Sequence, residues 1–410
     1  TDRHSLYAAA FVRSVATGMV GVLLGVYLAQ LNLSTETIGV TVSSGLAGAL
    51  LSTLVTTFLA DRIGHRRSLL ALSSLSFIGG IGFAASSHQL VLAAAAFIGM
   101  INGMGRDRGA ALVLEQAVLP ATTSSAERTM AFAQYNVLQD VGHAVGALMA
   151  GLPALFERSN AAAEALAFRF SIVAYAVLCL LPCIAYLRLS PRIEQSGLGK
   201  TVRVAPSSRR ILWKISLLFA IDSIAGGFLT AALLSFFFYE RFGVRVESIA
   251  ALFFFARVAN AGSHMLAAWL AKRIGLVNTM VFTHIPSSLL LVTVAFAPNF
   301  TVAAILFLLR ESLVEMDVPT RQSYVMAVVD RSERTLASGV THLVRLGGWA
   351  IAPAFAGVLM SGSLLAIPLF VGAGMKILYD VLLWRAFRGI QPPEEREGSN
   401  SVADRNKQSV

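Results

Sequence analysis

Ionisable side chains within long apolar segments are the residues of this sequence best suited to chemistry. A charged residue near the centre of a bilayer costs about 2.5–3.5 kcal/mol or more, so each should face a polar cavity or an opposite charge. Guanidinium groups there could bind an anionic group of a solute, whereas carboxylates and histidine could take up and release protons. We predict substrate-binding or proton-coupling roles for Arg13, Asp107, Asp140, His143, Asp222, Arg257, Arg310, Glu311 and Arg345.

The alternative for any of these charges is a salt bridge that joins helices and binds nothing else. We favour that role for Lys376 and Asp380, because residues four apart on a helix can pair with each other. Asp317 and Arg321 flank Pro319, which disfavours regular helix, and we expect a gating or structural role for them. Arg106, Asp107 and Arg108 are consecutive, cannot share one helix face, and should have different partners.

Apolar runs long enough to cross a bilayer must position these charges. The 410 residues are 56% hydrophobic and 14% charged, far from the roughly 45–50% and 25% of soluble domains. Runs of about 20 apolar residues are long enough to span a membrane. We predict an all-α polytopic membrane protein with twelve transmembrane helices, near residues 6–30, 37–60, 68–87, 90–113, 128–152, 166–188, 211–238, 247–271, 277–297, 301–324, 334–361 and 364–387.

The distribution of Lys and Arg gives the orientation. With the N-terminus inside, the inner segments carry 22 of the 33 basic residues and the outer loops carry three. Such a bias predicts that both termini are cytoplasmic, in a cell (inner) membrane. It also explains the net charge of +10 without nucleic acid as a partner.

Two short signatures repeat at an offset of about half the chain. Leu-Ala-Asp-Arg-Ile-Gly at 59–64 returns as Leu-Ala-Lys-Arg-Ile-Gly at 270–275, and Ser-Ala-Glu-Arg-Thr at 125–129 returns as Arg-Ser-Glu-Arg-Thr at 331–335. The repeats indicate two six-helix bundles related by duplication. The expected domains are a bundle at 1–188, a cytoplasmic linker at 189–210, a second bundle at 211–388 and a disordered cytoplasmic tail at 389–410.

The loop after the second span carries a recognisable motif. Asp61, Arg62, Gly64 and the basic pair Arg66-Arg67 match most of the pattern Gly-x-x-x-Asp-Arg-x-Gly-basic-basic, with Thr57 at the leading Gly. Together with the six-plus-six layout, this resembles the major facilitator superfamily across the whole chain. The resemblance implies a central cavity, lined by spans 1, 4, 7 and 10, that opens alternately to either side.

The same resemblance implies a gate at the inner face. An acid at position 61 would face the N-terminal end of span 11, whose free N–H groups attract an anion. The neighbouring basic residues would complete a charge network that latches the two halves. The predicted gating residues are Asp61, Arg62, Gly64, Arg66, Arg67, Arg273, Glu333 and Arg334.

Motifs of soluble enzymes and cofactor sites are missing from the sequence. It has no phosphate-binding loop, no nucleophile elbow and no His/Cys cluster with metal-ligand spacing, so we expect no enzyme activity, no cofactor and no metal. Cys179 and Cys183 lie one helical turn apart, which disfavours a disulfide. The expected partners are a small solute, protons and the bilayer, and the chain should act as a monomer.

A secondary active transporter for a small polar or charged organic solute is the function that these features favour. Gly142, Gly146 and Gly151 in span 5, followed by Pro153, favour export by exchange. The first alternative is a multidrug efflux antiporter, whose apolar cavity Phe236–Phe238 and Phe253–Phe255 could supply, although we favour lipid-facing packing for them. The second alternative is a receptor or scaffold that does not transport, which the retained charges disfavour.

Overall fold

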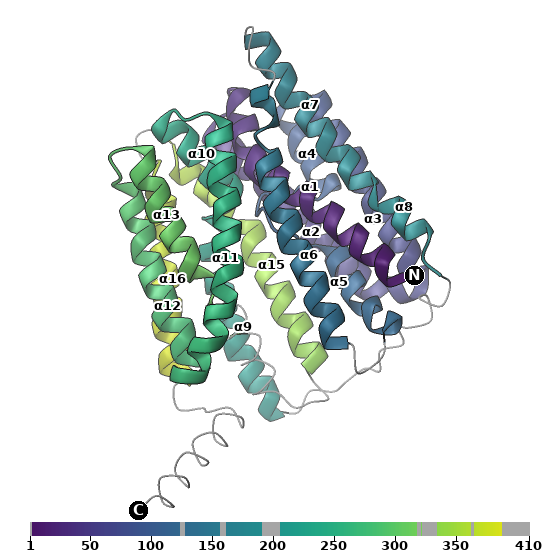
Figure 1. Ribbon diagram of the computed structural model, residues 1–410, viewed down its shortest axis with the longest axis vertical. Coiled ribbons are helices and arrows are strands. Elements are labelled where there is room, and N and C mark those ends of the chain that lie inside the picture. Colours follow the sequence, from purple (N-terminus) through teal and green to yellow (C-terminus); the bar gives the residue numbers. More distant parts are fainter. Residues whose placement is uncertain are drawn as a thin grey trace, which may run out of the picture.

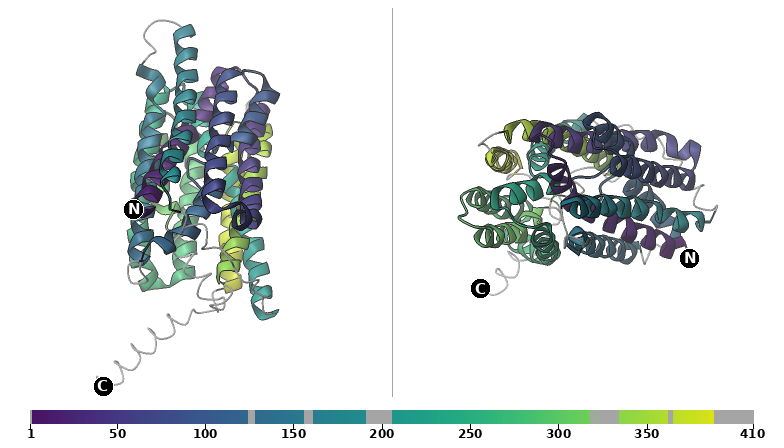
Figure 2. Two further views of the ribbon diagram at one scale, coloured as in Figure 1. Left: turned by 90° about the vertical axis from the view of Figure 1, so that its right-hand side faces the viewer. Right: turned by 90° about the horizontal axis from the view of Figure 1, so that it is seen from above.

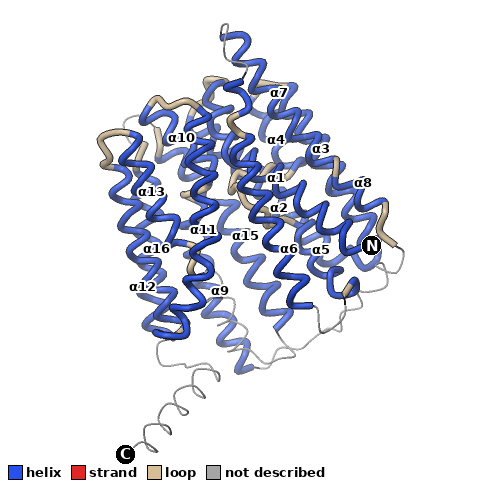
Figure 3. The backbone as a smooth tube through the Cα atoms, viewed as in Figure 1, coloured by secondary structure: helices blue, strands red, loops and turns tan. Residues whose placement is uncertain are grey.

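The computed structural model describes residues 2–123, 128–155, 161–190, 206–317, 321, 334–361 and 365–387. Within these ranges the chain is built from helices joined by short loops, as the tube in Figure 3 shows. The first group comprises α1 (Asp2–Gln30), α2 (Thr35–Ile63), α3 (His65–Ala85), α4 (Gln89–Gly99), α5 (Ala110–Val118), α6 (Arg128–Met149), α7 (Ala161–Leu180) and α8 (Pro182–Leu187). The second comprises α9 (Pro206–Gly227), α10 (Ala231–Phe242), α11 (Val246–Ile274), α12 (Leu276–Ala295), α13 (Phe300–Val314), α15 (Arg334–Leu359) and α16 (Ile367–Phe387).

Nine helices of the described ranges are long and apolar enough to cross a membrane. They confirm an all-α polytopic membrane protein. The remaining expected spans correspond to the short α4 and α5, to α6, and to α13 with the residues that follow it. The total of twelve therefore stays a prediction.

Within the described ranges, two of the expected spans are interrupted by several residues, and the span at 166–188 only by Leu181 between α7 and α8. The prediction of a continuous helix at 90–113 is wrong, because Met100–Gly109 is not helical. Within this segment Gly105 has a φ of 70°, a backbone conformation that favours glycine. Asn102 stabilises the break, since its amide nitrogen donates to the Arg106 carbonyl at 2.7 Å and its amide oxygen accepts from Met104 N–H at 2.8 Å. The second interruption is at Phe228–Thr230, where the Thr230 hydroxyl caps α10 by accepting from Leu233 N–H.

The two groups of helices lie largely side by side, with the early helices on the right and most of the later helices on the left in Figure 1. Figure 2 gives the perpendicular views. The groups are joined where α15 packs against α2, α10 against α1 and α11 against α6. Small residues allow these approaches: a Cβ at Gly25 would collide with α10, and Gly39 lies against Gly357.

These contacts lie on the side of the molecule that holds the loop after α1 and the loop after α10. Gly25, Gly39 and Gly151 all contact the second group near that side. The Ser43 hydroxyl accepts a hydrogen bond from Ala354 N–H at 2.8 Å across the same interface. The structure is therefore closed on this side.

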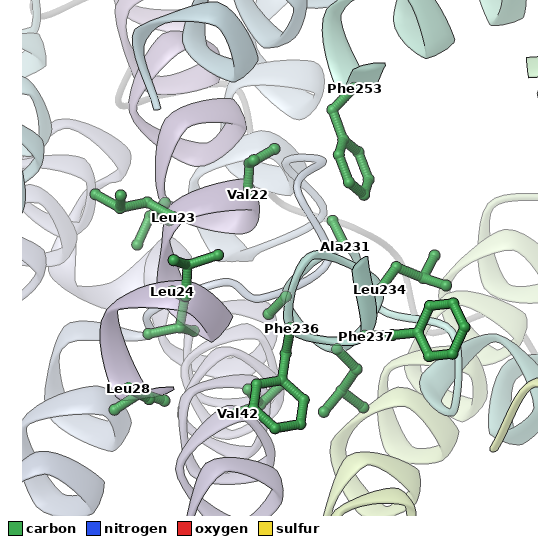
Figure 4. Close-up of a cluster of buried hydrophobic side chains, with 14 of the residues drawn as sticks. Val22, Leu23, Leu24, Leu28, Val42, Ala231, Leu234, Phe236, Phe237 and Phe253 are labelled. Carbon is green, nitrogen blue, oxygen red and sulfur yellow. The ribbon is translucent and has the colours of Figure 1, made fainter. Parts of the chain in front are cut away.

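The phenylalanines of α10 are not lipid-facing, contrary to the expectation from sequence. Phe236, Phe237 and Phe238 are buried against α1, α2 and α13, and Figure 4 shows Phe236 beside Leu24 and Val42. The prediction was wrong because α10 is enclosed at the interface between the two groups. On α11, Phe253 is also buried, whereas Phe255 is exposed as expected.

Candidate functional site

A cavity of about 110 Å³ lies between the break at 100–109 and the second group of helices. Its lining includes six basic and three acidic side chains. The basic ones are Arg106, Arg108, Arg257, Arg310, Arg345 and Lys376, and the acidic ones are Asp222, Glu311 and Glu315. Five of the nine predicted site residues are therefore brought together here. Phe253, Phe307 and Trp349 add an aromatic surface.

Asp222 on α9 is the most heavily paired acid of the cavity. Its carboxylate lies 3.1 Å from Lys376 Nζ, 3.4 Å from Arg321 Nη1 and 3.5 Å from Arg345 Nη2. Arg321 also pairs with Asp317. Asp222 thus holds cations from three other parts of the chain around one buried carboxylate.

The other two acids of the cavity come from span 10. Glu311 pairs with Arg310 and accepts a hydrogen bond from the Asn260 amide at 2.9 Å. Glu315 pairs with Arg106 at 3.0 Å, which links the second group of helices to the break in the first. Within the described ranges, Arg310 Nε is a buried N–H with no hydrogen-bond acceptor, and so is Arg345 Nε.

Two guanidinium groups of the cavity have no carboxylate within ion-pair distance among the residues that the structure describes. Arg108 lies 4.6 Å from the centroid of the Trp349 ring, which Arg345 also approaches at 4.8 Å. Arg257 lies beside the positive-φ Gly105 of the break. The cavity therefore carries an excess of positive charge.

Arg13 and Asp107 lie in a second, smaller cavity of about 70 Å³ within the first group of helices, apart from the main one. Arg13 pairs with Asp107 and, through both terminal nitrogens, with Glu115 at 2.6 and 2.8 Å. Glu115 is 0% exposed and also accepts from the Tyr135 and Tyr186 hydroxyls. Arg13 is thus fully occupied by protein partners.

The remaining two predicted site residues line neither cavity. His143 accepts a hydrogen bond at Nε2 from Asp107 N–H at 2.8 Å, so it helps to hold the break at 100–109. Asp140 makes no hydrogen bond or ion pair with another residue that the structure describes. Neither side chain is placed to touch a solute in the main cavity.

Comparison with known proteins identifies the family. The model of the Major Facilitator Superfamily matches residues 6–353, which is most of the chain. The protein belongs to the Major Facilitator Superfamily. Its members are membrane transporters, so this chain is a transporter and not an enzyme.

Relatives of this superfamily protein agree with that assignment. An uncharacterized membrane protein of Saccharomyces cerevisiae is 24% identical over 95% of this chain and 94% of its own length. The nucleoside transporter NupG has a similar structure, with a TM-score of 0.74, 13% identity, and coverage of 94% of this chain and 99% of that chain. The xylose transporter XylE from E. coli, in a partially occluded inward-open conformation, is also similar in structure, with a TM-score of 0.74 and 14% sequence identity. The match covers 96% of this chain and 98% of that chain.

The predicted gate of this transporter is only partly visible. Glu333 and the side chains of Asp61 and Arg334 lie outside the described residues. Gly64 forms the joint between α2 and α3 with a φ of 99°. Arg66 donates to the Leu187 carbonyl of its own group at 2.8 Å, Arg62 and Arg67 are exposed, and Arg273 stacks on Trp269. The latch between the halves stays a prediction.

The prediction that Lys376 and Asp380 pair with each other is wrong. Lys376 bonds to Asp222 across the helix interface, and Asp380 bonds to His284 Nδ1 at 2.9 Å. The three charges at 106–108 do take different partners, namely Glu315, Arg13 and Trp349. They do so from an irregular segment rather than from a helix.

Sequence reasoning also missed residues that line the main cavity or hold Arg13 beside the second one. Glu115 was overlooked although it is an acid inside an apolar run, and that was the available signal. The pairing roles of Trp349, Tyr135 and Tyr186 had no such signal, because aromatic residues in a membrane helix usually serve packing.

Proposed function

We propose that this transporter moves a small organic anion, coupled to protons, by alternating access between its two halves. The observation that carries the proposal is the excess of cations in the main cavity. Burying a guanidinium group without a counter-charge is costly, so an anion that pairs with Arg108 and Arg257 would bind favourably. Planar guanidinium groups match carboxylate and phosphate oxygens in a bidentate geometry.

The aromatic residues suggest that the anion also has an apolar part. Phe253 and Phe307 have ring centroids 5.6 Å apart, and both line the cavity with Trp349. An apolar portion of a solute could pack there while its anionic group faces the arginines. The nine charged groups of the lining argue against a multidrug exporter for purely lipophilic compounds.

The proposed setting is the cytoplasmic (inner) membrane, with both termini in the cytoplasm and one chain as the working unit. In that orientation the closed side of the structure faces outward, and the structure is inward-facing. Support comes from the excess of basic residues in the inner segments.

Ligand-induced thermal stabilisation of the purified protein tests the substrate class. The panel contains benzoate, succinate and glucose 6-phosphate as anions, xylose and uridine as neutral solutes, and tetraphenylphosphonium as a lipophilic cation. We expect stabilisation by at least one anion and a weaker effect of the others. Stabilisation by the neutral solutes or the cation alone would refute the proposal.

Variants of the cavity arginines test whether the stabilising anion binds in the main cavity. Arg108→Gln and Arg257→Gln should each weaken binding of the stabilising anion by about ten-fold or more, because a charge-assisted hydrogen bond contributes roughly 1.5–3 kcal/mol. Arg241→Gln is the matched control, since Arg241 is exposed in the last turn of α10 and does not line the cavity.

Proton coupling is tested by uptake of that anion into proteoliposomes with an imposed pH gradient. Asp222→Asn and Glu311→Gln change the two acids among the predicted coupling residues that line the main cavity. If both variants keep gradient-driven uptake at the wild-type rate, these acids are not the coupling groups.

A further inference from the structure

Four titratable side chains form a continuous chain from the main cavity into the core of the second group of helices. Asp222 lies 3.1 Å from Lys376 Nζ, and Nζ lies 3.2 Å from His284 Nε2. His284 Nδ1 in turn lies 2.9 and 3.1 Å from the two oxygens of Asp380. The groups come from α9, α16 and α12, so the chain exists only in the folded protein.

Only the first two members of this chain reach the cavity. Asp222 and Lys376 line it, whereas His284 is 1% exposed and Asp380 is 0% exposed. A buried carboxylate and a buried imidazole are costly in a membrane protein unless they have a function or a partner. Here they partner each other, and Lys376 connects them to the cavity.

With Lys376 as the ammonium that pairs with Asp222, the bonding pattern assigns the protons of His284. A lysine ammonium has only donors, so His284 Nε2 must accept from Lys376. The imidazole proton is then on Nδ1, where it is donated to Asp380. His284 is thus neutral in this arrangement, and Lys376 is shared between Asp222 and His284.

We propose that His284 and Asp380 form a proton-binding site, and that protonation of this site changes the position of Lys376 in the main cavity. This inference rests on the proposed coupled transport of an anion. A proton passes from Nζ of Lys376 to Nε2 of His284, and a hydronium ion in the cavity water then protonates the resulting amine, so that one proton in total is taken up from solution. Nε2–H then faces the ammonium, and the hydrogen bond between them is lost. Asp380 stabilises the imidazolium formed.

Loss of that bond connects proton uptake to the solute. The repelled ammonium of Lys376 moves towards the cavity, where it adds to the positive charge that receives the anion. Proton and anion therefore bind with positive linkage, and by reciprocity each raises the affinity for the other. Positive linkage favours movement of both in the same direction, in place of the export by exchange that the glycines suggested.

Other groups around the site bear on its protonation. On α16 the Tyr379 ring lies edge-on to His284 with centroids 6.3 Å apart, and its buried hydroxyl has no hydrogen-bond partner within the described ranges. Arg321 and Arg345 approach the far side of Asp222. Helices α11 and α13 also pack on α12. None of the charged side chains described on these two helices forms a hydrogen bond with His284.

Histidine NMR tests the proposal with the proton as the only ligand. The protein, labelled with ¹⁵N-histidine in lipid nanodiscs, is titrated with acid, and the His284 signal is identified by its loss in His284→Asn. We expect the Nδ1–H tautomer at neutral pH. In Lys376→Met the signal should change to the protonated form at a pH about one unit or more higher, because the opposing ammonium is gone.

Controls separate this result from misfolding and from the transport proposal. Lys214→Met, which removes an exposed lysine, should leave the His284 titration unchanged, and Lys376→Gln repeats the test if Lys376→Met is poorly folded. An Nε2–H tautomer in the wild type, or equal titrations with and without Lys376, would overturn the proposal. Because no solute is present, that outcome would leave anion binding by the cavity arginines standing.

Discussion

The backbone N–H of Ala232 donates a 3.0 Å hydrogen bond to the carbonyl oxygen of Gly103. Gly103 lies in the break that interrupts the expected fourth span, and Ala232 lies in the first turn of α10, directly after the break of the seventh. A helix end leaves backbone groups without partners from its own helix. Here each break supplies a partner for the other, so the two halves meet through backbone at the level of the main cavity.

Gly25→Val should open the closed side of the transporter. A Cβ at this position would meet the carbonyl oxygen of Ala232 and the Cβ of Phe236, so α1 and α10 must separate. Overpacking costs about 1–3 kcal/mol, which would disfavour the observed state by about 5- to 150-fold. Spin-label distances between the loops that follow α1 and α10 should lengthen. Gly374→Val, at a glycine with open space around it, should leave them unchanged.

Ser43→Ala should weaken the same interface more gently. The Ser43 hydroxyl accepts from Ala354 N–H across the interface of α2 and α15, and a hydrogen bond contributes about 0.5–1.5 kcal/mol. We expect the closed population in the same distance measurement to fall by about two- to twelve-fold relative to the open one. Ser44→Ala is the control, because the Ser44 hydroxyl donates to Val40 of its own helix. An equal effect of both variants would contradict a role for the bond between halves.

Glu115→Gln should destabilise the first group of helices. Its carboxylate accepts from both terminal nitrogens of Arg13 and from two tyrosine hydroxyls, and removing one partner of a buried pair costs about 3–5 kcal/mol. A thiol-reactive dye that reports exposure of the buried Cys179 should show a lower melting temperature. Glu240→Gln, at an exposed position, should melt like the wild type. Equal melting of all three proteins would show that the cluster does not stabilise the fold.

Replacements of His143 distinguish a structural acceptor from a proton shuttle. His143→Gln keeps a side-chain acceptor for Asp107 N–H, whereas His143→Leu leaves that donor unpaired at a cost of about 1–3 kcal/mol. We expect the Gln variant to retain folding and gradient-driven uptake and the Leu variant to lose stability in thermal unfolding. If both variants fold normally and both lose coupling, His143 carries protons and its acceptor role is secondary.

The amino-acid sequence determined the membrane character and the family of this protein, because these depend on local properties. Apolar run length decides whether a segment can cross a bilayer, and the repeated signatures around Gly64 and Gly275 predict a duplication. The high cost of a charge in a membrane also pointed to Asp222, Arg257, Arg310 and Arg345, which the cavity does bring together.

Only the tertiary structure decided which charges meet. Lys376 and Asp380 could pair along their own helix, but Asp222 on α9 and His284 on α12 lie closer to them across the helix interfaces. The break at 100–109 likewise depends on contacts from elsewhere, since His143 on α6 holds Asp107 and Ala232 on α10 holds Gly103. Pairing energies fall steeply with distance, and distances between residues on different helices are set by packing rather than by spacing in the chain.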